Sequence, residues 1–220
     1  MGRFSASRFA ALIPGSWRRT FGIRFDKSAI QNVDNLAEFI QTRSAYIAQT
    51  SLYGYLKTRM GTRFRQIFED DKFLPSINKA KWLTYGACLS DLTVFAAAMT
   101  GVEGRLGKNE ISNLARKCFE AAVQQTFEGD EADEVRAEIV ERFEARLEQT
   151  HWPNAAIGEY AFTSSPKVLL ESAPIADELK EQDVEIVTNS IRFRWRDVRE
   201  QLRRRIDRDA ICAEWQAIER

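Results

Sequence analysis

The stretch Trp82–Met99, with the sequence WLTYGACLSDLTVFAAAM, decides the fold. Its apolar residues occupy nearly every face of a helix, and its single charged residue is Asp91. A helix that is apolar all round lies either in the core of a protein or across a membrane. A carboxylate at the midpoint of a span would cost roughly 2.5 to 3.5 kcal/mol on an insertion scale. We therefore predict a central, buried helix over about residues 75–100 and no transmembrane span.

The sequence on either side of this stretch shows the three-to-four-residue apolar spacing of further helices. Proline, which interrupts helices, is confined to positions 14, 75, 153, 166 and 174. We expect helices over about 34–68, from a cap at Asn109, from 130 to about 150, and from 174 to 208 or beyond. Between 151 and 173 we expect irregular chain with one short helical turn at Lys167–Glu171.

These patterns predict an all-α fold, namely a helical bundle of about five helices with a long C-terminal helix and a basic N-terminal arm. We expect the arm to cover residues 1–25 and a single helical domain to cover residues 26–220. Two glycines seven residues apart in the first helix, Gly54 and Gly61, predict close approach of another helix.

Composition limits the possible classes of function. Hydrophobic residues make up 44% of the chain and charged residues 29%, which is the balance of a globular protein. The 32 basic and 32 acidic side chains cancel, so no overall field attracts nucleic acid or a membrane. Cys88, Cys118 and Cys212 are far apart and form no disulfide, zinc or redox motif. The first apolar run, Phe9–Ile13, is too short for a secretory signal, which favours a cytoplasmic location.

No residue stands in a recognisable catalytic motif. The sequence lacks the Gly-x-Ser-x-Gly elbow of serine hydrolases, and its only histidine is His151. One histidine cannot supply the two Glu-x-x-His pairs of a di-iron bundle. The glycines of Gly101–Lys108 are spaced one residue too far apart for a phosphate-binding loop. We predict no catalytic residue, no metal site and no cofactor.

Asp91 is the most informative single residue. A carboxylate on a helix buried on all sides is paired, protonated or functional. Arg43 interrupts the apolar stripe of the first helix, so we predict a buried polar pair between Arg43 and Asp91. The competing hypothesis is a small hydrolase or ligand-binding enzyme, with a pocket between helices near Asp91, Arg43 and Tyr85.

The arm carries arginines and aromatic residues but no acid. Its candidate contact residues are Arg3, Phe4, Arg8, Phe9, Trp17, Arg18 and Arg19. Interleaved cationic and apolar side chains suit an anionic membrane surface or a partner. An organellar transit peptide has the same composition, and the aromatics could equally pack on the domain.

The last helix carries an apolar seam that begins near Val184 and continues to Ile206 with spacings of three and four. The residues predicted to form an interaction seam are Ile191, Trp195, Val198 and Leu202. A seam of this length requires a helical partner, either in this chain or in a second copy.

A basic stripe runs beside the seam and consists of Arg192, Arg196, Arg199 and Arg203. Nucleic acid would bind such a stripe. The acidic fourth helix, residues 130–148, could instead face it within the chain or head to tail in an oligomer, so nucleic acid is the less favoured partner.

Three segments, Ala173–Lys180 (APIADELK), Glu185–Arg192 (EIVTNSIR) and Leu52–Tyr55 (LYGY), resemble uncharacterised bacterial helical proteins that are sometimes labelled esterase. The resemblance implies an all-helical fold and transfers no catalytic residue. The leading expectation is a non-enzymatic interaction or adaptor protein whose partner is another protein or a second copy. An anionic membrane surface is a further candidate partner through the arm. A small hydrolase or ligand-binding enzyme comes second, and a nucleic-acid-binding protein third.

Overall fold

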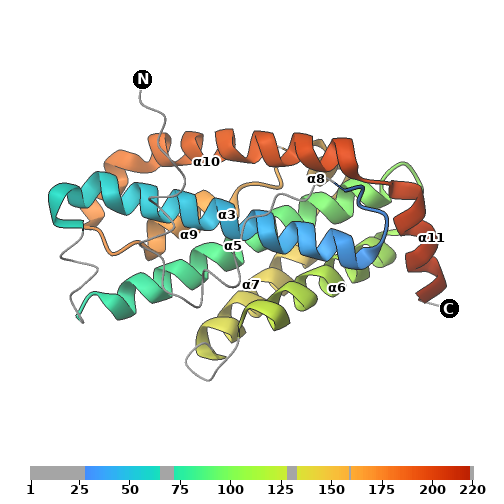
Figure 1. Ribbon diagram of the computed structural model, residues 1–220, viewed down its shortest axis with the longest axis horizontal. Coiled ribbons are helices and arrows are strands. Elements are labelled where there is room, and N and C mark those ends of the chain that lie inside the picture. The colour runs from blue at the N-terminus through green and yellow to red at the C-terminus, as the bar shows by residue number, and fades with distance from the viewer. Residues whose placement is uncertain (1–27, 65–71, 128–132, 159, 219–220) are drawn as a thin grey trace.

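The computed structural model describes residues 28–64, 72–127, 133–158 and 160–218, and this part of the chain is an all-α bundle, as predicted (Figure 1). The predicted arm lies outside the described residues. In chain order the α-helices are α3 (Val33–Met60), α5 (Leu74–Gly101), α6 (Lys108–Thr126), α7 (Asp133–Gln149), α8 (Trp152–Ile157), α9 (Ser164–Ser172), α10 (Asp177–Arg205) and α11 (Arg208–Ile218). A short 3-10 turn, η2 (Gly61–Arg63), follows α3.

Helix α5 forms the centre of the bundle. Every residue from Leu83 to Gly101 is buried, and α3, α6, α7, α8, α9 and α11 pack around the helix. Among the described residues, α5 is the one helix long and apolar enough to cross a membrane, but its apolar window is completely buried by these neighbours. The structure thus places the Trp82–Met99 stretch in the core, as expected.

Glycine positions show which helices approach closely. A Cβ at Gly86 would lie 2.5 Å from Ile139, because α7 crosses α5 at this point. The prediction of a close approach at Gly54 and Gly61 is wrong, since a Cβ at either position would meet no atom within 4 Å. Gly61 instead ends α3 with a left-handed φ of 56°, a conformation that glycine adopts without strain.

The segment 151–173 is more helical than expected. The predicted turn at Lys167–Glu171 is part of a longer helix, α9, and a second helix, α8, precedes it. Pro153 lies in the first turn of α8, where the missing N–H removes no helical hydrogen bond. The N-terminus of α9 is completed from another part of the chain by Asp91, as described below. The third helix begins at Lys108 rather than after Asn109, because the Glu110 carboxylate accepts a 2.6 Å hydrogen bond from the Gly107 N–H.

The long C-terminal helix stops at Arg205, and a separate helix, α11, follows. Ile30 pairs with Ile206 in an isolated bridge, which holds the chain in extended conformation between the two helices. Asp207 then accepts a hydrogen bond from the Ala210 N–H at 3.1 Å and starts α11.

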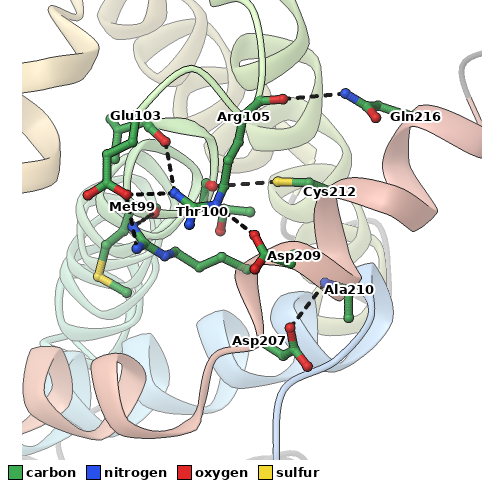
Figure 2. Close-up of polar contacts among 11 residues, drawn as sticks. Met99, Thr100, Glu103, Arg105, Asp207, Asp209, Ala210, Cys212 and Gln216 are labelled. Carbon is green, nitrogen blue, oxygen red and sulfur yellow. Dashed lines mark hydrogen bonds and ion pairs between the residues drawn. The ribbon is translucent and has the colours of Figure 1, made fainter.

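Helix α11 is held against the end of α5 by the polar contacts drawn in Figure 2. Arg105 bonds Asp209 at 2.8 Å and Glu103 at 2.7 Å, and Arg208 contacts Glu103 at 3.2 Å. The neighbouring arginines lower the pKa of both carboxyls. Cys212 donates to the backbone carbonyl oxygen of Thr100. These contacts hold α11 against the end of α5, and the carboxylates of Glu103 and Asp209 remain exposed to solvent.

Candidate interaction surface on helix α10

The predicted interaction seam is part of the core of this chain. Ile191, Trp195, Val198 and Leu202 are all buried, and α9 and α3 pack against α10. The indole N–H of Trp195 donates a 3.0 Å hydrogen bond to Ser165 Oγ. The partner helices of the seam therefore come from the same chain, and these four residues are not available to a second copy.

The seam is shorter than predicted at its N-terminal end. Val184 is 51% exposed, and the buried residue beside it is Asp183. Asp183 takes the inward position because its carboxylate accepts from Tyr55 at 2.9 Å and binds the guanidinium of Arg59, both on α3. Arg59 and Tyr55 lower the pKa of the Asp183 carboxyl by hydrogen bonding to it.

A second apolar row lies on the outside of α10. Leu179, Ile186 and Phe193 are spaced seven residues apart, so they share one face, and they are 37%, 68% and 60% exposed. We call these three residues the outward stripe. This stripe was not predicted from the sequence, because the inner seam already explained the apolar pattern of the helix. The seven-residue spacing of the three residues was nevertheless present in the sequence.

Charges along α10 change sign from one end to the other. The exposed acids of the first half are Asp177, Glu178, Glu181 and Glu185. The exposed arginines of the second half are Arg192, Arg196, Arg203 and Arg204, and they outnumber its exposed acids, Asp197 and Glu200. This order complements the helix dipole, and it gives the two ends of the outward stripe opposite charge.

Three of the four residues of the basic stripe face solvent. Arg192, Arg196 and Arg203 are exposed, whereas Arg199 is half-buried beside Gly158 and lies 5.8 Å from the ring centroid of Phe162. The prediction that the acidic helix covers this stripe within the chain is wrong. Figure 1 shows α7 and α10 on opposite sides of the bundle.

The carboxylates of α7 have nearer partners than the basic stripe. Glu144 binds Arg116 of α6 at 2.9 Å, and Glu138 binds Arg142 of α7 itself at 2.7 Å. Because these partners lie on α6 and α7, neither glutamate covers the basic stripe of α10, and its exposed arginines remain accessible to solvent.

A groove of about 440 Å³ runs between α3 and α10. Phe193 and Tyr46 form part of its wall, next to Arg43 and Arg194. Arg43 donates from Nε to Gln201 of α10 at 3.0 Å, so it belongs to this groove and not to Asp91. The prediction of an Arg43–Asp91 pair is wrong, because the face of α5 that carries Asp91 is turned towards α7 and α9.

Asp91 is completely buried and its partners are two backbone amides and an arginine. Oδ1 accepts from Arg146 Nη1 at 2.5 Å and from the Ser164 N–H at 3.1 Å, and Oδ2 accepts from the Ser165 N–H at 2.8 Å. Because the first amides of a helix have no partner within it, Asp91 acts as the cap of α9.

Arg146 of α7 completes this cluster. Its guanidinium also donates to Ser90 Oγ at 3.0 Å, to Ser164 Oγ at 2.9 Å and to the backbone carbonyl of Ala161. Asp91 and Arg146 thus join α5, α7 and α9 in one polar cluster. A carboxylate held by three donors and closed to solvent has no free position for a substrate, so the geometry supports a structural role for Asp91.

The other titratable groups of interest are buried, with the exception of His151. Tyr85 bonds Thr126 at 3.0 Å on the α6 side, which separates it from the groove that contains Arg43. Burial raises the pKa of the Cys118 thiol to about 12 and that of Cys88 well above its ordinary value. Burial also lowers the pKa of Lys81 to about 7. His151 is exposed at the start of α8, and its side chain caps no helix.

Within the described ranges, no group of three or more His, Cys, Asp or Glu side chains could hold a metal ion. Comparisons with protein-family models, with curated proteins and with solved structures find no match. The resemblance to esterase-labelled helical proteins receives no support from them. The outward stripe, with its charged ends and the adjoining groove, is the candidate functional site.

Proposed function

We propose that this protein is a non-enzymatic helical interaction protein that recognises a partner protein through the outward stripe of α10. The observation that carries the proposal is the exposure of Leu179, Ile186 and Phe193 in a row on a helix whose opposite face is buried from Val187 to Leu202. Isolated exposed apolar residues are ordinary on protein surfaces, whereas an apolar row with charged flanks is typical of an interface.

The neighbouring features fit this role. The groove beside Phe193 gives the surface a concave edge, with apolar surface from Phe193, Tyr46 and Val198 next to the charged groups of Arg43, Arg194 and Asp197. A few aromatic and arginine residues supply most of the binding energy of many interfaces, and both types border this groove. Because the inner seam holds α10 in the core, the stripe is presented on a rigid helix and little ordering is needed on binding.

A matched pair of variants tests the proposal. Ile186→Glu combined with Phe193→Glu places two charges in the stripe, and Ile218→Glu places one on the exposed residue at the end of α11. Tagged proteins are cross-linked in the host cell and purified, and circular dichroism confirms that each variant is folded. The wild type and Ile218→Glu should give the same protein adducts, and the stripe variant should lose them. Adducts that persist unchanged in the folded stripe variant would refute the proposal.

The arm is proposed as a second contact, with an anionic membrane surface. The support is its composition of arginines and aromatics without acid, which suits an interfacial segment. Co-sedimentation of the full chain and of a chain beginning at Asp26, with anionic and with neutral vesicles, provides the test. Binding to anionic vesicles by the full chain alone is expected. Equal binding by both chains, or none by either, would remove the membrane from the proposal.

A polyanion is a second candidate ligand, because the basic stripe is not covered by α7 and Arg192, Arg196 and Arg203 are exposed. Binding of a fluorescent oligonucleotide should then weaken steeply as salt rises, and Gln at these three positions should reduce the salt dependence. An oligonucleotide that does not bind at low ionic strength would eliminate this candidate.

A further inference from the structure

We infer that the partner of the outward stripe is the outward stripe of a second copy, with the two α10 helices packed antiparallel about a twofold axis that passes Ile186. This inference rests on the proposed function and names the partner for the same surface. A twofold interface requires a surface that complements itself, since each contact occurs twice. The apolar row and the charges of α10 both meet that requirement.

The apolar row is symmetric about Ile186. Leu179 precedes Ile186 by seven residues and Phe193 follows it by seven. In an antiparallel pair centred on Ile186, Leu179 therefore lies level with the partner subunit's Phe193, and the two copies of Ile186 meet at the axis. Phe193 lines the groove between α3 and α10, so the partner's Leu179 reaches the edge of that groove.

The charges at the two ends of the stripe match in the same register. With a rise of about 1.5 Å per residue, Glu178 lies roughly 12 Å from the axis, and the partner's Arg192 and Arg196 lie roughly 9 and 15 Å from it. Glu178 thus falls between two arginines of the other copy, on the same flank of the stripe. In a parallel pair the two copies of Glu178 would lie level with each other but on opposite flanks of the interface, far from the arginines of the other copy. The Glu178–arginine contacts therefore form only in the antiparallel arrangement.

The inner contacts of α10 do not oppose this pairing. Asp183 remains bound to Arg59, and Trp195 remains bound to Ser165, because both lie on the side of the helix that faces the chain's own core. The pair therefore forms without opening the bundle, and a variant of the stripe changes the association without changing the fold.

Cysteine cross-linking tests the orientation directly. The native Cys88, Cys118 and Cys212 are all buried, so a short bis-maleimide reacts with introduced surface thiols. Ile186→Cys should cross-link to itself. Leu179→Cys and Phe193→Cys should each fail alone and cross-link when the two proteins are mixed. Val184→Cys, which is exposed but outside the stripe, is the matched control and should give no product.

Self-cross-linking of Leu179→Cys alone and of Phe193→Cys alone would show a parallel pair and overturn the inference. Sedimentation equilibrium of the full chain provides the second readout, with a mass of twice 25.3 kDa expected. Glu178→Arg should raise the dimer dissociation constant about tenfold. Adding Arg192→Glu and Arg196→Glu to that variant should restore most of the affinity.

The outcomes also separate this inference from the proposed function. A monomer at every concentration, together with stripe-dependent adducts to a different protein in cells, would overturn the second copy as partner and leave the interaction role intact. A monomer without stripe-dependent adducts would overturn both. Dimers that persist in the folded Ile186→Glu variant would place the interface elsewhere and overturn the inference.

Discussion

Removal of the Asp91 carboxylate, in the variant Asp91→Ala, should be among the most damaging single substitutions in the described part of the protein. The side chain is fully buried and accepts hydrogen bonds from Arg146 and from the backbone amides of Ser164 and Ser165. Alanine leaves the guanidinium of Arg146 without its counter-charge in the interior, and it leaves two amides of α9 without a partner.

The size of the effect follows from these contacts. Breaking a buried ion pair by removing one member costs about 3 to 5 kcal/mol, because an uncompensated charge remains buried. The side chain of Arg146 is 16% exposed, so water reaches it only in part. Small domains have a total free energy of unfolding of about 5 to 15 kcal/mol. Asp91→Ala should therefore remove a large share of the stability.

Urea denaturation followed by circular dichroism and by tryptophan fluorescence measures this change. Arg146→Met is the second single variant, and the double variant Asp91→Ala with Arg146→Met should cost less than the sum, since the second change removes the unpaired charge. Glu200→Ala is the control, because its pair with Arg204 is exposed and should change the free energy of unfolding by less than about 0.5 kcal/mol.

Two results would refute this reasoning. One is a decrease of less than about 1 kcal/mol in the free energy of unfolding of Asp91→Ala, which would mean that water reaches the cluster or that its hydrogen bonds are weak. The other is strict additivity of the two single variants, which would mean that Asp91 and Arg146 do not act on each other. Amide hydrogen exchange should also show faster exchange in α9 in the Asp91→Ala protein.

Trp195→Ala should lower the free energy of unfolding by about 3 to 5 kcal/mol in urea titrations, because the ring is fully buried in the core; a loss below about 1 kcal/mol would place the seam at the surface. Gly86→Ala should lower the free energy of unfolding by about 1 to 3 kcal/mol, since the added Cβ meets Ile139. Gly54→Ala should raise it by about 0.5 to 1 kcal/mol, because nothing lies near the added Cβ. Equal effects of the two substitutions would contradict the helix packing. Burial lowers the pKa of Lys81 to about 7. Between about pH 7 and 10 the folded protein therefore binds fewer protons than the unfolded chain, and the contribution of Lys81 to the free energy of unfolding increases with pH. Lys81→Met should lack this increase. If the free energy of unfolding depended on pH in the same way in the wild type and in Lys81→Met, the lowered pKa would be contradicted.

The sequence was sufficient for the fold class and for the central helix. The stretch Trp82–Met99 is apolar on all faces, and such a helix has few arrangements other than the middle of a bundle. The inner seam around Trp195 was also visible, because a period of three and four residues identifies the buried side of a helix. Whether its partner lay in this chain or in another copy depends on tertiary packing.

The partner of Asp91 could not be derived in the same way. Helical periodicity shows that Arg43 and Asp91 each point inward on their own helix, but not which helices face each other. The structure turns the Asp91 face of α5 towards α7, where Arg146 lies. Helix α9 was predicted only as a short turn at Lys167–Glu171, and its start at Ser164 was missed for a related reason. The cap of α9 is Asp91, which is 74 positions away from Ser165.

The boundary between α10 and α11 was predictable in part. Asp207 is a residue type that starts helices, and this signal was present in the sequence. The extended residue before it depends on pairing with Ile30, a contact across most of the chain. The outward stripe shows the same limit, because only the packed structure separates the apolar residues of α10 into a buried seam and an exposed row.

Hydroxyl-radical footprinting of side chains, at low and at high protein concentration, tests the division of α10 most directly. In dilute protein, Phe193 and Ile186 should be oxidised and Trp195 should be protected. At high concentration the two stripe residues should become protected, while Ile157 and Ile218 remain reactive. Oxidation of Trp195 in the folded protein would contradict the buried seam. The interaction surface would be contradicted if Phe193 and Ile186 stayed equally reactive at high concentration and also in the presence of every cross-linked partner.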